Sequence, residues 1–142
     1  MPERAHHEHP VWAEIAPELR PGEFRFPYLM DVDFLRLLSR IRRACGVPFR
    51  IVSDHRPPDR NAAAGGATKS AHMEEPCAAV DLRVLSNEER FRLVRAAIEH
   101  GVTRIGVYPP TPSQRASYGK GAGSVHLDAS RTNPSPRMWM EA

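Results

Sequence analysis

The sequence has little cysteine and no long apolar run. Cys45 and Cys77 are the two cysteines among 142 residues, far apart and in segments of different type, so the sequence indicates two buried free thiols and neither a disulfide framework nor a CxxC metal motif. No stretch has the roughly 20 apolar residues needed to span a bilayer, and residues 1–12 lack the apolar core of a signal peptide. We therefore expect no membrane insertion, no signal peptide and synthesis in the cytoplasm.

A run of like charges is also missing. The chain has 20 Lys and Arg against 17 Asp and Glu, scattered along its length, which gives a net charge of +3. This pattern gives no support to nucleic-acid binding. A pI of 9.2 suits approach to an acidic polymer such as a cell wall, although proteins with neutral partners share it.

Two segments have the apolar spacing of amphipathic helices. The first begins at Asp31 or Asp33, either of which can cap it, and ends at Gly46. The second opens with a capping box at residues 86–89 and ends at Gly101. The expected apolar face of this second helix consists of Phe91, Val94 and Ile98.

Short segments rich in strand-forming residues account for the rest of the expected core. They span residues 49–53, 79–83, 104–108 and 124–128. The segment between the last two strands is too short for a parallel crossover. The pattern therefore predicts a single α+β domain with a mainly antiparallel sheet flanked by helices.

Three further segments carry turn-forming residues and few apolar ones. Residues 54–70 and 109–123 are expected to be loops. Residues 1–29 are expected to form an irregular N-terminal arm packed on the remaining domain, residues 30–142.

Two histidines lie where a metal ion can be bound. His72 follows the glycine-rich segment and precedes the strand that carries Asp81, and His126 lies inside the last predicted strand. A catalytic zinc ion commonly has three His or carboxylate ligands and one open position. Asp128 is two residues after His126, on the same strand face. The alternative for each histidine is an ordinary hydrogen-bonded pair with a carboxylate.

The order of several short blocks resembles peptidase family M15, in its branch from phages and bacteria. The upstream blocks are residues 51–57, Asn61, 65–67, 70–72 and 79–81, and the downstream blocks are residues 105–108, 125–128 and 137–139. The resemblance implies the fold shared by these D-Ala-D-Ala peptidases and the hedgehog signalling domain. It also implies a Zn²⁺ ion bound by His72, Asp81 and His126.

The same resemblance assigns Arg56 to the substrate. A guanidinium group suits a peptide carboxylate or a developing oxyanion, whereas the alternative is a surface ion pair with Asp54 or Asp59. Ser70 matches the serine before the first ligand, where it orients His72 or simply stabilises a turn.

The sequence departs from the family pattern at three places. The interval from His72 to Asp81 is two residues longer, so the intervening turn must bulge. His55 replaces a tyrosine and is a candidate substrate contact. Gly123 stands three positions before His126, where many M15 enzymes have the acidic general base.

A glycine cannot transfer a proton, so the base must be another residue. Asp128 is the first candidate and Glu74 or Glu75 the second. The alternative role for Asp128 is to hold a metal ligand in place.

The resemblance implies a zinc metallopeptidase that hydrolyses peptidoglycan stem peptides, as a D-Ala-D-Ala carboxypeptidase or an endopeptidase. Because no signal peptide is expected, a phage particle or lysis system would have to deliver the protein to the wall. A first alternative is a catalytically weak or inactive zinc-binding component of a virion or wall-binding assembly, and a second is a hedgehog-like interaction module.

Overall fold

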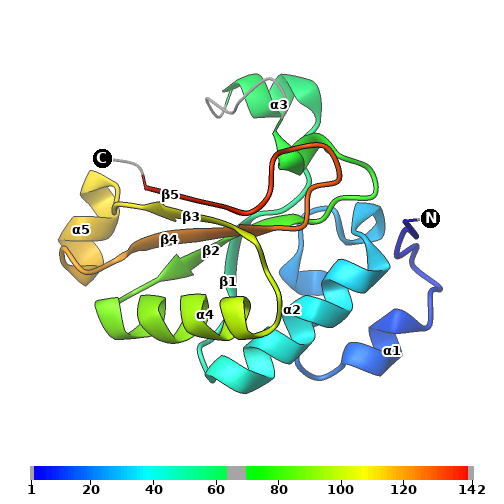
Figure 1. Cartoon of the computed structure of the whole chain (residues 1–142), viewed down its shortest axis with the longest axis horizontal. Coiled ribbons are helices and arrows are strands. Elements are labelled where there is room, and N and C mark those ends of the chain that lie inside the picture. The colour runs from blue at the N-terminus through cyan, green and yellow to red at the C-terminus, as the bar shows by residue number, and fades with distance from the viewer. Residues whose placement is uncertain (1, 64–69, 141–142) are drawn as a thin grey trace.

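Five strands form one mixed sheet in the order β1-β2-β4-β3-β5 in the computed structural model, which describes residues 2–63 and 70–140 (Figure 1). The strands are β1 (Arg50–Ser53), β2 (Ala79–Val84), β3 (Arg104–Tyr108), β4 (Gly123–Asp128) and β5 (Arg137–Met140). All neighbouring strands are antiparallel except β3 and β5, which are parallel. The α+β fold with a mainly antiparallel sheet is confirmed.

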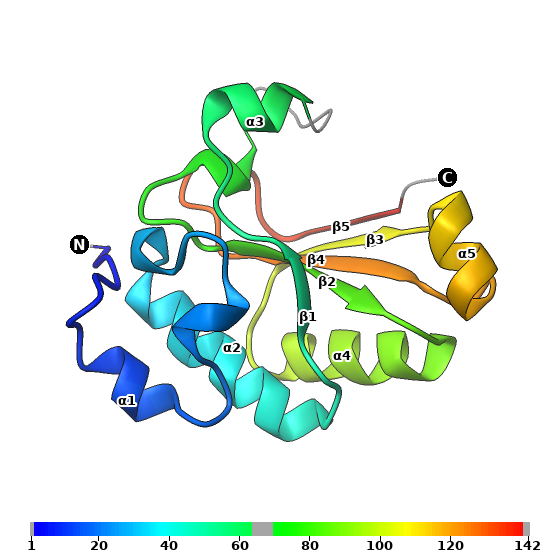
Figure 2. The same ribbon diagram turned by 180° about the vertical axis from the view of Figure 1, so that it is seen from behind.

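The helices divide between the two sides of this sheet. They are α1 (Val11–Ile15), α2 (Val32–Cys45), α3 (Pro58–Ala63), α4 (Asn87–Glu99) and α5 (Pro112–Tyr118), with short 3₁₀ turns at Pro21–Glu23, Pro27–Leu29 and Ala71–Met73. Figures 1 and 2 show α2 and α4 on one side of the sheet and α3 on the other. Among the described residues, no helix is both long and apolar enough to cross a membrane.

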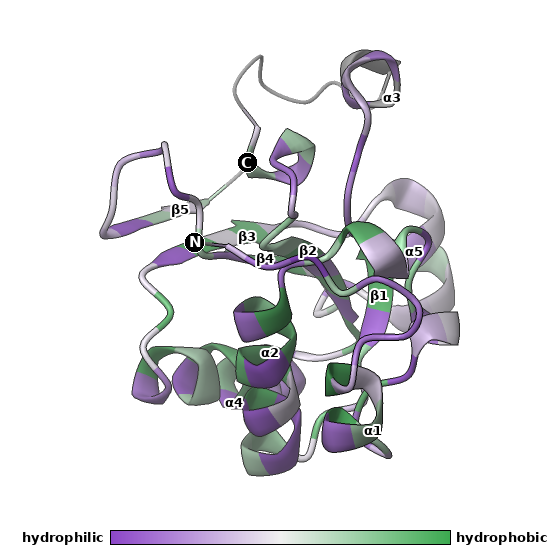
Figure 3. Ribbon diagram, turned by 90° about the vertical axis from the view of Figure 1, so that its right-hand side faces the viewer, coloured by the Kyte–Doolittle hydropathy of each residue, from purple (hydrophilic) through white to green (hydrophobic). Residues whose placement is uncertain are grey.

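Helix α2 forms as its end signals predict. The Asp31 side chain accepts a hydrogen bond from the Phe34 N–H at 2.8 Å, and Gly46 ends the helix in the left-handed conformation with φ 64°. Hydrophobic and hydrophilic residues alternate along α2 in Figure 3, as expected for a helix with one face packed on the sheet. Its buried side chains form the core with Val80, Leu82, Val125 and Leu127.

The predicted apolar face of α4 is wrong at two of its three positions. Phe91 and Ile98 are 64% and 53% exposed, and the buried residues of α4 are Leu93, Ala96 and Ala97. Small alanine side chains let α4 approach its neighbours closely, so the helix packs through them in place of the larger residues.

Two segments predicted as loops contain helices. Thr111 caps α5 reciprocally with Gln114, and Pro112 occupies its first position. No residue of α5 is buried, so its capping residues, and not its apolar content, were the signal. Part of the predicted loop at 54–70 is α3, which begins with Pro58 and has Asp59 in its first turn. Residues 64–69 lie outside the described part of the chain.

The first 29 residues pack along α2. Trp12, Ile15, Leu19 and Phe24 are buried in the core, and a β-bridge joins Arg4 to Asp31. Strand β5, at the other end of the chain, was not among the predicted strands. Cys45 and Cys77 are buried free thiols, as predicted.

Candidate metal centre

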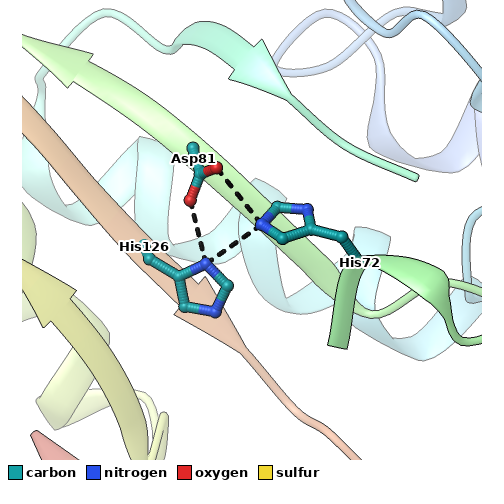
Figure 4. A group of neighbouring side chains, drawn as sticks. All are labelled: His72, Asp81 and His126. Carbon is teal, nitrogen blue, oxygen red and sulfur yellow. Dashed lines mark hydrogen bonds and ion pairs between the residues drawn. The ribbon is translucent and has the colours of Figure 1, made fainter. Parts of the chain in front are cut away.

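The register of β2 and β4 brings Asp81 opposite His126. Val80 and Leu82 on β2 and Val125 and Leu127 on β4 are buried in the core, so the alternate residues face the side of the sheet away from α2 and α4. We call this side the site face. His72, in the 3₁₀ turn at Ala71–Met73, reaches the same place from a segment outside the sheet (Figure 4).

The three predicted ligands form one compact cluster. His72 Nε2 lies 3.2 Å from His126 Nδ1, and the Asp81 carboxylate lies 2.9 Å from His126 Nδ1 and 3.2 Å from His72 Nε2. One ligand atom from each residue lies within 4.8 Å of the other two. The longer turn between His72 and Asp81 therefore does not separate them.

The outer nitrogen of His72 is fixed by the chain that follows β1. His72 Nδ1 donates to the backbone carbonyl of Asp54 at 2.6 Å. The Asp54 carboxylate in turn accepts a hydrogen bond from the Phe26 N–H at 2.8 Å, which ties the N-terminal segment to this turn. Burial raises the pKa of the Asp54 carboxyl group, although the hydrogen bond from Phe26 opposes the shift.

The outer nitrogen of His126 is fixed by Asp128. His126 Nε2 lies 2.5 Å from Asp128 Oδ2. The other oxygen, Oδ1, accepts hydrogen bonds from Arg104 Nε at 2.8 Å and from the Ser130 N–H at 2.9 Å. Burial tends to raise the pKa of Asp128, but the hydrogen bond and charge of His126 outweigh it and lower the pKa, with smaller contributions from the Ser130 N–H and from Arg104.

These outer partners decide which ring nitrogens carry protons. A carbonyl oxygen and an ionised carboxylate can only accept, so we assign the protons to His72 Nδ1 and His126 Nε2. In the neutral rings the inner nitrogens then present lone pairs to each other and to Asp81. Three acceptors that face one another without a donor repel, unless a proton or a cation lies among them.

Trp139 of β5 covers one side of His126. Its ring centroid lies 5.3 Å from that of His126, its Nε1 donates to the Tyr108 hydroxyl at 2.8 Å, and the Arg104 guanidinium lies over the ring at 5.2 Å. A Cβ atom at Gly106 would lie 2.6 Å from the indole, so glycine is required where Trp139 crosses β3.

Position 123 faces away from the metal centre. Gly123 pairs with Val84 at the start of β4 and is three residues from His126, so the two lie on opposite faces of the strand. A Cβ atom there would meet the Tyr108 carbonyl oxygen at 2.3 Å and the Arg90 side chain at 3.0 Å. An acidic side chain therefore has no room at this position.

The two other candidate bases differ in their contacts. Glu74 accepts hydrogen bonds from the Ser130 hydroxyl at 2.5 Å and the Arg131 N–H at 3.0 Å, so both its oxygens are engaged. Glu75 is 60% exposed and lies 3.2 Å from His55 Nε2. Among the residues that the structure describes, His55 is its one polar partner.

The predicted substrate-binding residues surround the His72 turn. The Arg56 N–H donates to the His72 carbonyl at 2.8 Å. Its side-chain Nε is buried and makes no hydrogen bond, and no ion pair joins Arg56 to Asp54, Asp59 or any other described residue. Ser70 Oγ accepts a hydrogen bond from the His72 N–H at 3.2 Å and so stabilises the turn.

His55 is buried and packs edge-on against Phe26, with a ring centroid distance of 5.8 Å. Its Nδ1 atom has no partner in the described part of the chain.

A comparison with protein families decides the assignment. The Peptidase M15 family profile matches residues 16–113, more than half of the chain. The chain belongs to the peptidase M15 family. The matched region contains His72 and Asp81 and ends before His126, which the β2–β4 register brings to them. No curated protein and no solved structure gives a significant match.

Membership of the M15 family makes the chain a peptidase, and the His72, Asp81 and His126 cluster is suited to a metal ion. Sequence reasoning missed the contributions of Asp54 and Arg104. No sequence pattern indicates either contribution. Asp54 contacts His72 through its backbone carbonyl, which any residue could provide. Arg104 reaches Asp128 through a strand register that the sequence does not reveal.

Proposed function

We propose that this M15 peptidase is a zinc metallopeptidase in which His72, Asp81 and His126 hold the ion. The arrangement of the two imidazoles carries the proposal. Both rings are hydrogen-bonded on their outer nitrogens, so both lone pairs converge beside a carboxylate. Two His and one Asp form a ligand set found at catalytic zinc, with a position left for water.

The surrounding residues would preorganise this ligand set. Asp54 and Asp128 fix the tautomers and orientations of His72 and His126, and Arg104 holds Asp128. Bound zinc would polarise the scissile carbonyl and lower the pKa of a coordinated water. Trp139 shields His126 from solvent on one side, which strengthens electrostatic interactions there.

Two of the predicted catalytic residues take distinct roles in this proposal. Arg56 lacks an ion pair among the described residues, so its guanidinium is available for a substrate carboxylate or the developing oxyanion. Asp128 is a positioning residue. Both its oxygens accept hydrogen bonds, and a lowered pKa makes it a poor proton acceptor.

The proton acceptor is best sought in the turn after His72. Glu74 is engaged at both oxygens, whereas Glu75 keeps one oxygen free of described partners. We therefore favour Glu75 over Glu74 as general base. Glu75→Gln should lower kcat about 10²–10⁴-fold with zinc retained, whereas Glu74→Gln should chiefly lower stability.

The proposed substrate is a peptidoglycan stem peptide, cleaved by a carboxypeptidase or an endopeptidase activity. Its support is the motif resemblance to the phage and bacterial branch of the family, together with the basic pI. Delivery to the wall by a phage particle or lysis system belongs to the same proposal.

The test compares the purified protein with a His126→Ala variant. Bound zinc is measured by atomic absorption, and release of new amino termini or of D-alanine from peptidoglycan is followed over time. The wild-type protein should bind about one zinc and release products, and the variant should do neither. Equal release by both proteins, or by neither, contradicts the peptidase proposal.

A second candidate is a zinc-binding component of a virion or wall-binding assembly with little or no activity. The observation that favours it is position 123, where an acidic side chain has no room. In that case the wild-type protein should bind zinc and sediment with peptidoglycan, yet release no products.

A further inference from the structure

Two of the three departures from the family pattern meet in the structure. His55 stands where the M15 pattern has a tyrosine, and Glu75 lies in the lengthened turn that follows His72. The His55 Nε2 atom lies 3.2 Å from Glu75 Oε1. At the third departure, Gly123, the pattern has an acidic residue. The contact therefore forms in a chain that lacks the usual general base.

His55 is held firmly in place. Its side chain is 3% exposed and packs edge-on against Phe26. Both of its neighbours in the chain are bound to His72. The Asp54 carbonyl accepts a hydrogen bond from His72 Nδ1, and the Arg56 N–H donates to the His72 carbonyl. The backbone on either side of His55 is thus fixed beside a metal ligand, and close packing leaves the ring little freedom to move.

Glu75 has the opposite surroundings. Its side chain is 60% exposed, and His55 is its one polar partner among the residues that the structure describes. A glutamate side chain this exposed ordinarily samples several rotamers. Contact of Oε1 with a buried, immobile ring favours one of them and leaves Oε2 without a described partner. A general base needs both properties, because it must be held in place and must still accept a proton.

The two ring nitrogens of His55 have different partners. A carboxylate only accepts hydrogen bonds, so we assign the proton of the neutral ring to Nε2, which faces Glu75. Nδ1 then carries the lone pair, and it is buried without a hydrogen bond in the described part of the chain. A buried acceptor without a partner costs stability. Packing alone therefore does not account for a histidine at this position.

We propose that His55 is a positioning residue that holds Glu75 as the general base, an inference that rests on the proposed peptidase function. The Nε2–H group binds Glu75 Oε1 and leaves Oε2 to take a proton from the attacking water. The pair thereby replaces the acidic residue for which position 123 has no room.

The first test compares two amide variants of position 55 in the zinc-loaded protein, with a peptidoglycan stem peptide as substrate. In His55→Gln the amide nitrogen lies about where Nε2 was, whereas in His55→Asn the side chain is too short to reach Glu75. His55→Asn should lower kcat about 3–30-fold with KM and bound zinc unchanged, and His55→Gln should stay within about threefold of the wild-type kcat. His9→Asn removes the exposed His9–Glu3 contact and should leave kcat unchanged.

A double-mutant cycle shows whether His55 acts through Glu75. In a Glu75→Gln background, His55→Asn should lower kcat no further, because the group that His55 positions has already lost its basic carboxylate. Losses of equal size in the two backgrounds, or equal losses in His55→Gln and His55→Asn, overturn the proposal.

The second test needs neither zinc nor turnover. A ring proton that is buried and hydrogen-bonded exchanges slowly with water, so the His55 Nε2–H should give an NMR signal in the metal-free wild-type protein. The signal should shift or broaden in Glu75→Ala and stay in place in Glu99→Ala, which alters an exposed pair of α4. A proton on Nδ1, or an unchanged signal in Glu75→Ala, overturns the proposal.

The two tests separate the two proposals. A His55 Nε2–H signal that depends on Glu75, without cleavage of any peptide by the zinc-loaded protein, supports the positioning and contradicts the peptidase function. Cleavage with a signal that ignores Glu75 contradicts the positioning alone. Thermal unfolding of each variant shows whether a lowered kcat reflects lost structure.

Discussion

His72 Nε2 lies 3.2 Å from His126 Nδ1, and the hydrogen bonds on the far side of each ring leave both of these atoms as acceptors. Asp81 adds a third acceptor to the pair. The fold thus places three lone-pair-bearing atoms around one point. The outer partners of the two rings, the Asp54 carbonyl and the Asp128 carboxylate, accept hydrogen bonds and provide no proton for this point.

Asp128→Asn should weaken zinc binding about 10–100-fold, because the charge that holds the His126 Nε2 proton is lost. Arg104→Met should act in the same direction with a smaller effect, since it removes one partner of Asp128. Zinc competition titrations measure both. Arg95→Met, on the exposed Arg95–Glu99 pair of α4, is the surface control. Unchanged zinc affinity with kcat reduced about 10²–10⁴-fold would make Asp128 the general base instead.

Gly123→Glu should not supply the missing base. Even Gly123→Ala places a Cβ atom 2.3 Å from the Tyr108 carbonyl oxygen, so both variants should lose about 1–3 kcal/mol of stability, or several degrees in Tm. Thermal denaturation measures the loss, and peptide hydrolysis shows whether Glu adds activity. A stable Gly123→Glu protein with higher kcat would refute this account of the strand face.

Gly106→Ala should displace Trp139 from its place beside His126, because the new Cβ atom would lie 2.6 Å from the indole ring. We expect a stability loss of about 1–3 kcal/mol and a change in tryptophan fluorescence. In a Trp139→Ala background the same substitution should cost little, giving a coupling of at least about 0.5 kcal/mol in a double-mutant cycle. Additive losses would mean that the two residues do not meet.

Zinc should stabilise the protein more as pH rises through neutrality. Burial tends to lower the pKa of His126, but hydrogen bonds to Asp128 and Asp81 outweigh it and raise the pKa above its ordinary value. In the metal-free protein, protonated His126 therefore stabilises the fold. This contribution to stability is complete below about pH 6.5 and is lost as pH rises through the raised pKa. Zinc requires the deprotonated ring, so protons compete with it up to a higher pH than at an ordinary histidine.

The measurement is the zinc-induced increase in Tm at about pH 5.5 and about pH 8. The increase should be clearly larger at the higher pH and absent in His126→Ala at both. Equal increases at the two pH values in the wild-type protein would show that zinc does not displace a proton from His126.

Local patterns determined much of the fold. Asp31 and Gly46 bound α2 because a side-chain cap and a left-handed glycine act on their own helix end. The alternation in β2 and β4 placed Asp81, His126 and Asp128 on one face for the same local reason. The low hydrophobic content of the segment that contains α5 predicted a loop. The helix forms because its first turn is capped, and none of its residues is buried.

The sequence by itself determined which residues offer metal ligands. Residue type fixes the imidazole and carboxylate chemistry, and the order of the motifs can be read directly from the sequence. The tertiary structure alone decided how those ligands are held. The carbonyl of Asp54, the pairing of Arg104 with Asp128 and the crossing of Trp139 over Gly106 all join segments far apart in sequence. Such contacts depend on strand order and register, which are set by packing of the whole core and not by any local pattern.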